Sequence, residues 1–136
     1  MRFMMLVIPK GYEKADPSAM PDAKHLYEMN IYNESLARAG VLLSLDGLLP
    51  PSDGVRVSFT NRKPKVTDGP FAEAKECVGG YWMIQVKSQE EAIEWAKRAP
   101  MNDDEIIEVR RVHEMEDFSP EVRAAVADLE EQHGRK

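Results

Sequence analysis

Two strand–helix–strand patterns follow one another along this chain, and that order restricts its fold more than any single motif does. A helix is predicted inside each pattern, beginning after Asp22 and after Ser88. The order is that of an α+β, ferredoxin-like βαββαβ subunit, in which both helices cover one face of an antiparallel sheet. The four strands are predicted from apolar or alternating stretches at residues 2–8, 41–49, 81–87 and 105–112.

Capping residues and helix breakers mark the ends of both helices. Asp22 is a predicted N-cap, and Gly40 is a natural stop for the same helix. Ser88 and Glu91 have the spacing of a capping box. The buried side of the first helix is expected at Leu26, Met29, Leu36 and Ala37.

Two further elements lie outside this order. Residues 55–60 alternate between apolar and polar side chains, and the chain returns over 64–67, which predicts an inserted β-hairpin. Ser119 followed by Pro120 predicts the start of a third helix within residues 117–132. The chain is therefore expected to comprise a ferredoxin-like domain at 1–113 and an acidic C-terminal helical extension at 114–136.

Both faces of the predicted sheet carry apolar side chains. Residues 2–8 are apolar on both sides, and residues 81–87 also present large side chains to both. Since the helices can cover only one face, we expect a homodimer in which the open sheet faces are apposed. The apolar stripe of the third helix either docks on its own subunit or reaches across to the partner.

Composition excludes several classes of protein. A chain of 136 residues with a net charge of −6 and no basic stripe is not typical of a nucleic-acid-binding protein. No apolar run approaches the roughly 18 residues of a membrane span, and the N-terminus lacks the features of a signal peptide. The single cysteine, Cys77, fits the reducing cytoplasm and a packing role. No residue spacing predicts a metal or another cofactor.

The segment DGPFAEAKE at residues 68–76 combines a Gly-Pro turn with three carboxylates and a lysine. Pro70 suits the first turn of a short helix. One interpretation is structural, with Asp68 as its cap and Phe71 in the core. The other is functional, with Asp68 acting as a base or substrate anchor in a polar pocket wall that also contains Glu73 and Lys75.

Asp46 and His25 are the other candidate catalytic residues. Alternation along residues 41–49 turns Asp46 away from the helices, on the same side as Leu42 and Ser44. There it is either a carboxylate with a perturbed pKa or a turn residue beside a glycine. His25 is either a cleft residue or an exposed helix histidine. The ligand-binding residues expected with Asp46 between the two sheets are Tyr81, Met83 and Arg110.

The signature TDGPFAEAKE at 67–76 resembles that of the DGPF-type branch of the YCII-related protein family. The resemblance extends to ARAGVLLSLDGLLPP at 37–51 and GGYWMIQVKSQEEAIEWAKRAP at 79–100, and it covers most of residues 1–113. It implies ferredoxin-like subunits that form a dimeric α/β barrel.

The resemblance implies less about activity. Some relatives carry a His-Asp pair proposed to act in a cleft, but by position their histidine falls nearer Glu28 than His25. Relatives with this barrel perform isomerase or elimination chemistry on small molecules. Many DGPF-type proteins are encoded beside extracytoplasmic-function sigma factors, which implies a regulatory or stress-linked setting. Two functions therefore stay open: a dimeric small-ligand-binding protein, or a small-molecule enzyme with Asp46 or Asp68 as base.

Overall fold

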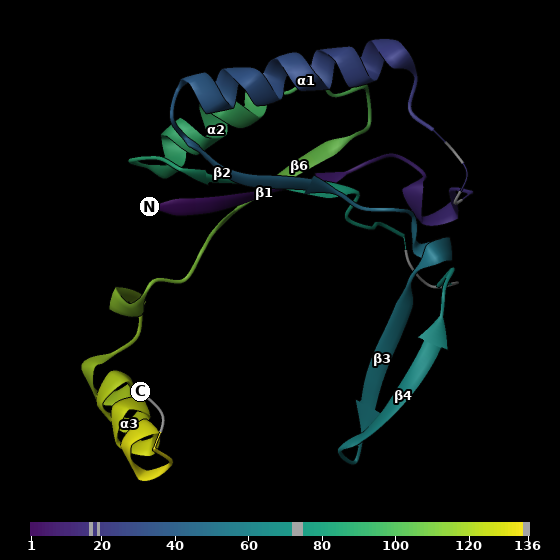
Figure 1. The fold of residues 1–136 in the computed structure, drawn as a ribbon. Coiled ribbons are helices and arrows are strands. Elements are labelled where there is room, and N and C mark those ends of the chain that lie inside the picture. The colour runs from purple at the N-terminus through teal and green to yellow at the C-terminus, as the bar shows by residue number, and fades with distance from the viewer. Residues whose placement is uncertain (17, 19, 72–74, 135–136) are drawn as a thin grey trace.

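A four-stranded antiparallel sheet with two helices on one face forms the main body of the protein (Figure 1). The computed structural model describes residues 1–16, 18, 20–71 and 75–134. The sheet has the order β2-β5-β1-β6, and α1 (Ala23–Arg38) and α2 (Gln89–Lys97) cover it. This mixed α+β arrangement is compatible with the predicted ferredoxin-like fold. The strands are β1 (Arg2–Ile8), β2 (Leu42–Gly47), β5 (Gly80–Gln85) and β6 (Ile106–Arg111).

The hydrophobic core lies between this sheet and the two helices. Tyr32 of α1 is only 5% exposed, and its ring meets the Trp82 ring edge-on at 5.1 Å between centroids. The predicted buried face of α1 is confirmed at Leu36 and Met29 but is wrong at Leu26 and Ala37, which are exposed. The buried core comprises Phe3, Met5, Tyr32, Leu36, Val41, Trp82, Ile84, Val86 and Ala92.

The predicted helix caps are confirmed. The side chains of Asp22, Ser88 and Ser119 each accept a hydrogen bond from the backbone N–H three residues later. Gly40 follows α1 with a φ of 73°, a left-handed conformation that glycine adopts without strain. The third helix, α3 (Pro120–Gln132), begins at Pro120 after its Ser119 cap, as predicted, and a 3-10 turn, η3 (Met115–Asp117), forms the first residue of the predicted 117–132 range and the two before it.

An irregularity in β2 changes which side chains face the helices. Leu42 lies opposite Ile84, whereas Ser44 lies opposite Met83, so the register shifts between these two residues of β2. Leu42 consequently packs against the core, and the expectation that it shares a face with Ser44 and Asp46 is wrong. A bulge places two residues against one and so breaks the simple alternation.

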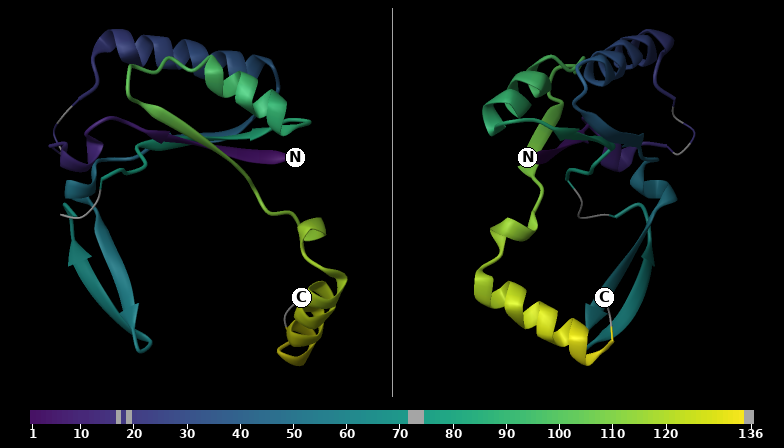
Figure 2. Two further views of the ribbon diagram at one scale, coloured as in Figure 1. Left: turned by 180° about the vertical axis from the view of Figure 1, so that it is seen from behind. Right: turned by 60° about the vertical axis from the view of Figure 1, so that its left-hand side comes forward.

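Two arms extend from the side of the sheet opposite the helices (Figures 1 and 2). The first is the paired strands β3 (Val55–Thr60) and β4 (Lys63–Asp68), which form their own two-stranded antiparallel sheet. The second is α3. Every residue of β3, β4 and α3 is exposed in the single chain. The exposed large apolar side chains of the arms are Val55, Val57, Phe59 and Val66 in the first, and Val122, Val126 and Leu129 in the second.

The DGPF segment fixes the base of the first arm. Gly69 donates a hydrogen bond from its N–H to the Gly54 carbonyl at 2.8 Å, and it lies against Pro51 of η2 (Pro51–Asp53). The interpretation that placed Phe71 in the core is wrong, because its ring lies outside the core under the Arg56 guanidinium, at 4.0 Å. The helical turn expected after Pro70 would extend over residues 72–74, which lie outside the described residues.

Two arginine–carboxylate pairs fix the start of the second arm. Arg2 binds Glu114 through two hydrogen bonds of 2.9 and 3.3 Å, and Arg111 binds Asp117 through two of 2.9 and 2.6 Å. The bonds from Arg111 are the main reason that the pKa of Asp117 falls from 3.8 to about 2. The Arg2 side chain likewise lowers the pKa of Glu114.

Candidate functional site

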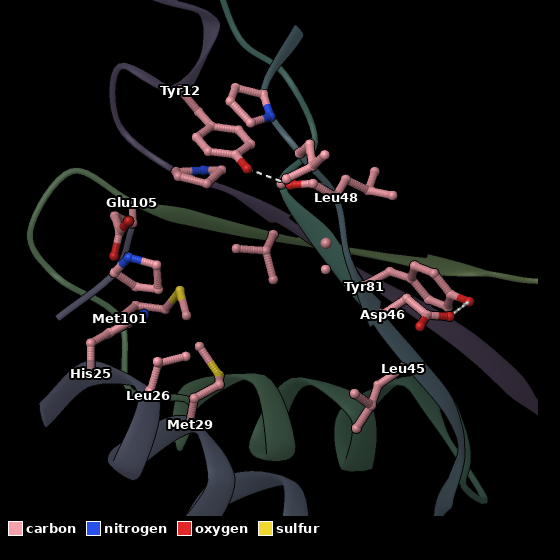
Figure 3. Close-up of a pocket in the computed structure, with 18 of the residues that line it drawn as sticks. Tyr12, His25, Leu26, Met29, Leu45, Asp46, Leu48, Tyr81, Met101 and Glu105 are labelled. Atoms are coloured by element: carbon pink, nitrogen blue, oxygen red, sulfur yellow. Dashed lines mark hydrogen bonds between the residues drawn. The ribbon is translucent and has the colours of Figure 1, made fainter. Parts of the chain in front are cut away.

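A pocket of about 730 Å³ opens between the first half of α1 and one end of the sheet (Figure 3). Tyr12 and Leu48 lie across it from Leu26 and Met29. His25, Met101 and Glu105 lie at one end, and Asp46 and Tyr81 lie at the other. Most of its lining is apolar, with a small number of polar side chains, which is the usual composition of a small-molecule site.

Two consecutive glycines let the walls of this pocket come together. A β-carbon on Gly79 would lie 2.6 Å from the Pro9 ring, and one on Gly80 would lie 2.9 Å from the Asp46 carbonyl oxygen. These distances are too short for a side chain at either position. Leu48 joins this wall through two hydrogen bonds, since its N–H donates to Gly79 and its carbonyl oxygen accepts from the Tyr12 hydroxyl.

The α1 side of the pocket is held by buried polar contacts. The Trp82 indole N–H donates to the Asn33 side-chain oxygen at 2.7 Å, and both residues line the pocket. Tyr32 lies behind them and donates its hydroxyl to the Trp95 carbonyl oxygen at 2.6 Å. Burial of that phenol raises its pKa from 10.0 to about 12. This part of the wall is therefore pre-formed.

His25 lies in the first turn of α1 and lines the pocket. Its position follows from the Asp22 cap, whose carboxylate accepts from the His25 backbone N–H at 2.7 Å. Glu105 and Asn102 line the same pocket, and the Glu105 side chain accepts from the Asn102 backbone N–H at 2.8 Å. The sequence reasoning identified His25 but missed Glu105, Asn102 and Asn33, whose proximity depends on how the elements pack.

Asp46 and Tyr81 are cross-strand neighbours, and the Tyr81 hydroxyl donates to the Asp46 carboxylate at 3.1 Å. The strand registers place both on the face opposite the helices, together with Met83 and Arg110, as the alternation predicted. Asp46 and Tyr81 border the pocket, whereas Met83 and Arg110 do not line it. Arg110 instead lies 3.8 Å from the Glu108 carboxylate on the sheet surface.

The residues predicted in the DGPF segment are not brought to this pocket. Asp68 is the last residue of β4 and pairs with Val55, and Lys75 is exposed in the following loop. Neither lines the pocket. Glu73 lies outside the described residues.

Cys77 lies near this region but is not an activated thiol. It is half-buried, and burial is the largest cause of the rise in its pKa. The Glu13 carboxylate raises the pKa further, while Arg56 lowers it. A raised thiol pKa reduces the thiolate fraction, which agrees with the predicted packing role.

The YCII-related domain family matches residues 1–116, nearly the whole of the body that carries this pocket. The chain belongs to this family. No curated protein matches it. In this YCII-related protein, the described residues contain no group of three His, Cys, Asp or Glu side chains placed to hold a metal ion. Nor does the described part contain a helix long and apolar enough to cross a membrane.

Proposed function

We propose that this YCII-related protein binds a small organic molecule in the pocket between α1 and the sheet. The pocket itself carries the proposal, because its volume of about 730 Å³ falls within the usual range of ligand sites, roughly 300–1,000 Å³. Its apolar walls supply binding energy, and His25, Asn33 and Glu105 supply polar contacts that orient a ligand.

Binding is better supported than acid–base catalysis. A catalytic carboxylate must reach the same reacting group as its partner acid. Asp46 accepts from Tyr81 on the open side of the sheet, and Asp68 lies at the base of the first arm. His25 lies at the opposite end of the pocket from Asp46 (Figure 3).

We also propose that the protein is a homodimer in which the open sheet faces are apposed as an α/β barrel, with the β3–β4 hairpin as an insertion. The uncovered face and the two arms support this, since they leave many large apolar side chains in water. Light scattering at micromolar concentration is expected to give about twice the 15.4 kDa chain mass, and a single-chain mass would contradict the dimer.

The Asp68–Phe71 motif supports assignment to the DGPF branch of the family. The link to an extracytoplasmic-function sigma factor and the cytoplasmic location stay predictions. In that setting, ligand binding would supply the regulatory signal.

A matched pair of pocket and surface variants tests the binding function. Leu26 and Ile31 are both half-exposed on α1, at 48% and 50%, but only Leu26 lines the pocket. In a thermal-shift screen of small metabolites, ligands should stabilise the wild type and Ile31→Trp. The same ligands should lose their effect on Leu26→Trp, whose indole fills the space. Ligands that stabilise all three proteins equally would place the site elsewhere and contradict the proposal.

A further inference from the structure

The charged side chains that line the pocket are all acidic. They are Asp22, Glu105 and Asp46, the last with its carboxylate bonded to Tyr81 on the open face of the sheet, and the described lining contains no lysine or arginine. The one basic side chain among the described lining residues, His25, offsets at most one of these negative charges. A ligand entering this pocket therefore meets a negative potential.

The hydrogen bonds made by these carboxylates leave their charge uncompensated. Asp22 accepts from the His25 backbone N–H, Glu105 from the Asn102 backbone N–H, and Asp46 from the Tyr81 hydroxyl. All three donors are neutral groups. Lys10, which follows the lining residue Pro9, binds Asp104 at 3.2 Å and does not line the pocket.

The N-terminus of α1 opposes this negative charge. A helix N-terminus carries the equivalent of about half a positive charge. Here the full negative charge of the Asp22 carboxylate caps it. Together with Glu105, the balance at this end of the pocket is negative, and a second negative charge placed beside these groups is disfavoured.

We infer that this pocket selects a small apolar molecule that carries a protonated amine, in preference to a neutral or carboxylate-bearing molecule of the same shape. The apolar walls bind the body of the ligand, and the amine lies toward Glu105 and Asp22. This inference rests on the proposed small-molecule function and specifies the ligand class for the same site.

Three indole probes that differ in charge test the inference: tryptamine, tryptophol and indole-3-acetate. By calorimetry at low ionic strength, tryptamine should bind most tightly and indole-3-acetate about tenfold or more weakly. The difference should shrink at high salt because ions screen the carboxylates. Glu105→Gln should weaken tryptamine several-fold and leave tryptophol unchanged. The control Glu108→Gln, on β6 outside the pocket, should change neither.

The outcomes separate this inference from the function on which it rests. Equal or tighter binding of indole-3-acetate, or unchanged tryptamine affinity in Glu105→Gln, would overturn the charge selection while leaving a small-molecule pocket intact. Failure of all three probes to bind would contradict the charge selection and the pocket function together.

Discussion

Gly69 packs so closely on Pro51 that a β-carbon at its position would lie 1.8 Å from the Pro51 carbonyl oxygen. The contact joins the end of β4 to η2, and the Gly69 N–H also binds the Gly54 carbonyl. The glycine of the DGPF motif therefore has a structural role, because it lets the first arm leave the body at a fixed position.

Gly69→Ala should destabilise this attachment. The added methyl group must displace backbone atoms, and such overpacking typically costs about 1–3 kcal/mol. Hydrogen exchange should show faster exchange in residues 55–68, with a lower urea midpoint. Gly47→Ala is the matched control, because no atom lies within 4 Å of its added carbon. Equal behaviour of the two variants would contradict the proposed role of the Gly69 contact.

Phe59→Glu should weaken the proposed dimer. Phe59 is 70% exposed on the apolar face of the first arm, where only a partner chain would bury it. Loss of that burial from both chains should raise the dimer dissociation constant by at least about tenfold. Ser58→Glu adds the same charge to the opposite face of β3 and should leave the dimer intact. Sedimentation velocity over a concentration series distinguishes these results, and equal dimerisation of both variants would exclude this arm from the interface.

Tyr32 should make the protein sensitive to alkali. In the unfolded chain its phenol ionises near pH 10, whereas in the folded protein burial raises its pKa to about 12. The unfolded state therefore loses its proton first, and stability falls as pH rises from 10 to 12, by about 2 kcal/mol. Tyr32→Phe should be less stable at neutral pH because it lacks the bond to Trp95, yet it should show a flatter pH dependence. Urea unfolding of the wild type and Tyr32→Phe between pH 10 and 12 measures this difference. An equal loss of unfolding free energy in the two proteins would contradict the prediction.

The Arg111–Asp117 pair should loosen in acid. Because the pKa of Asp117 is lowered to about 2, its contribution to stability is present above its ordinary pKa of 3.8 and is lost as pH falls toward 2. Carboxyl-carbon NMR should give a midpoint near 2, and Arg111→Gln should raise it. Arg110→Gln removes a neighbouring charge that does not bind Asp117 and should leave the midpoint unchanged. A similar rise of the Asp117 midpoint in both variants would show that the overall positive charge nearby, rather than the two hydrogen bonds from Arg111, lowers the pKa of Asp117.

Much of the fold could be predicted because its signals are local. The caps at Asp22 and Ser88 each involve residues three positions apart, and the turn at Gly40 depends on one residue. The register shift at Leu42 could not be predicted, because it reflects how β2 fits against β5. The prediction that Phe71 enters the core failed for a similar reason, since the Arg56 side chain that covers its ring comes from β3, which is distant in the sequence.

The candidate site was predictable only where strand alternation determined it. Alternation placed Asp46 and Tyr81 on one face, and the structure joins them by a hydrogen bond. The pocket itself combines Tyr12 of the 3-10 turn η1 (Tyr12–Lys14), the first half of α1 and the segment around Glu105, which lie far apart in the sequence. Its acidic lining therefore emerges only from the packing of these segments, although His25, one of the predicted site residues, lies among the residues that line it.

Methionine-methyl NMR tests the central claim, that this pocket binds small molecules, most directly. Met29 and Met101 line the pocket, whereas Met115 lies in η3 outside it. Titration with tryptamine, tryptophol and indole-3-acetate in turn should shift the methyl signals of Met29 and Met101 saturably with at least one probe and leave that of Met115 unchanged. Shifts confined to Met115 or to Met83 on the open sheet face, or no saturable shift at Met29 and Met101, would contradict the claim.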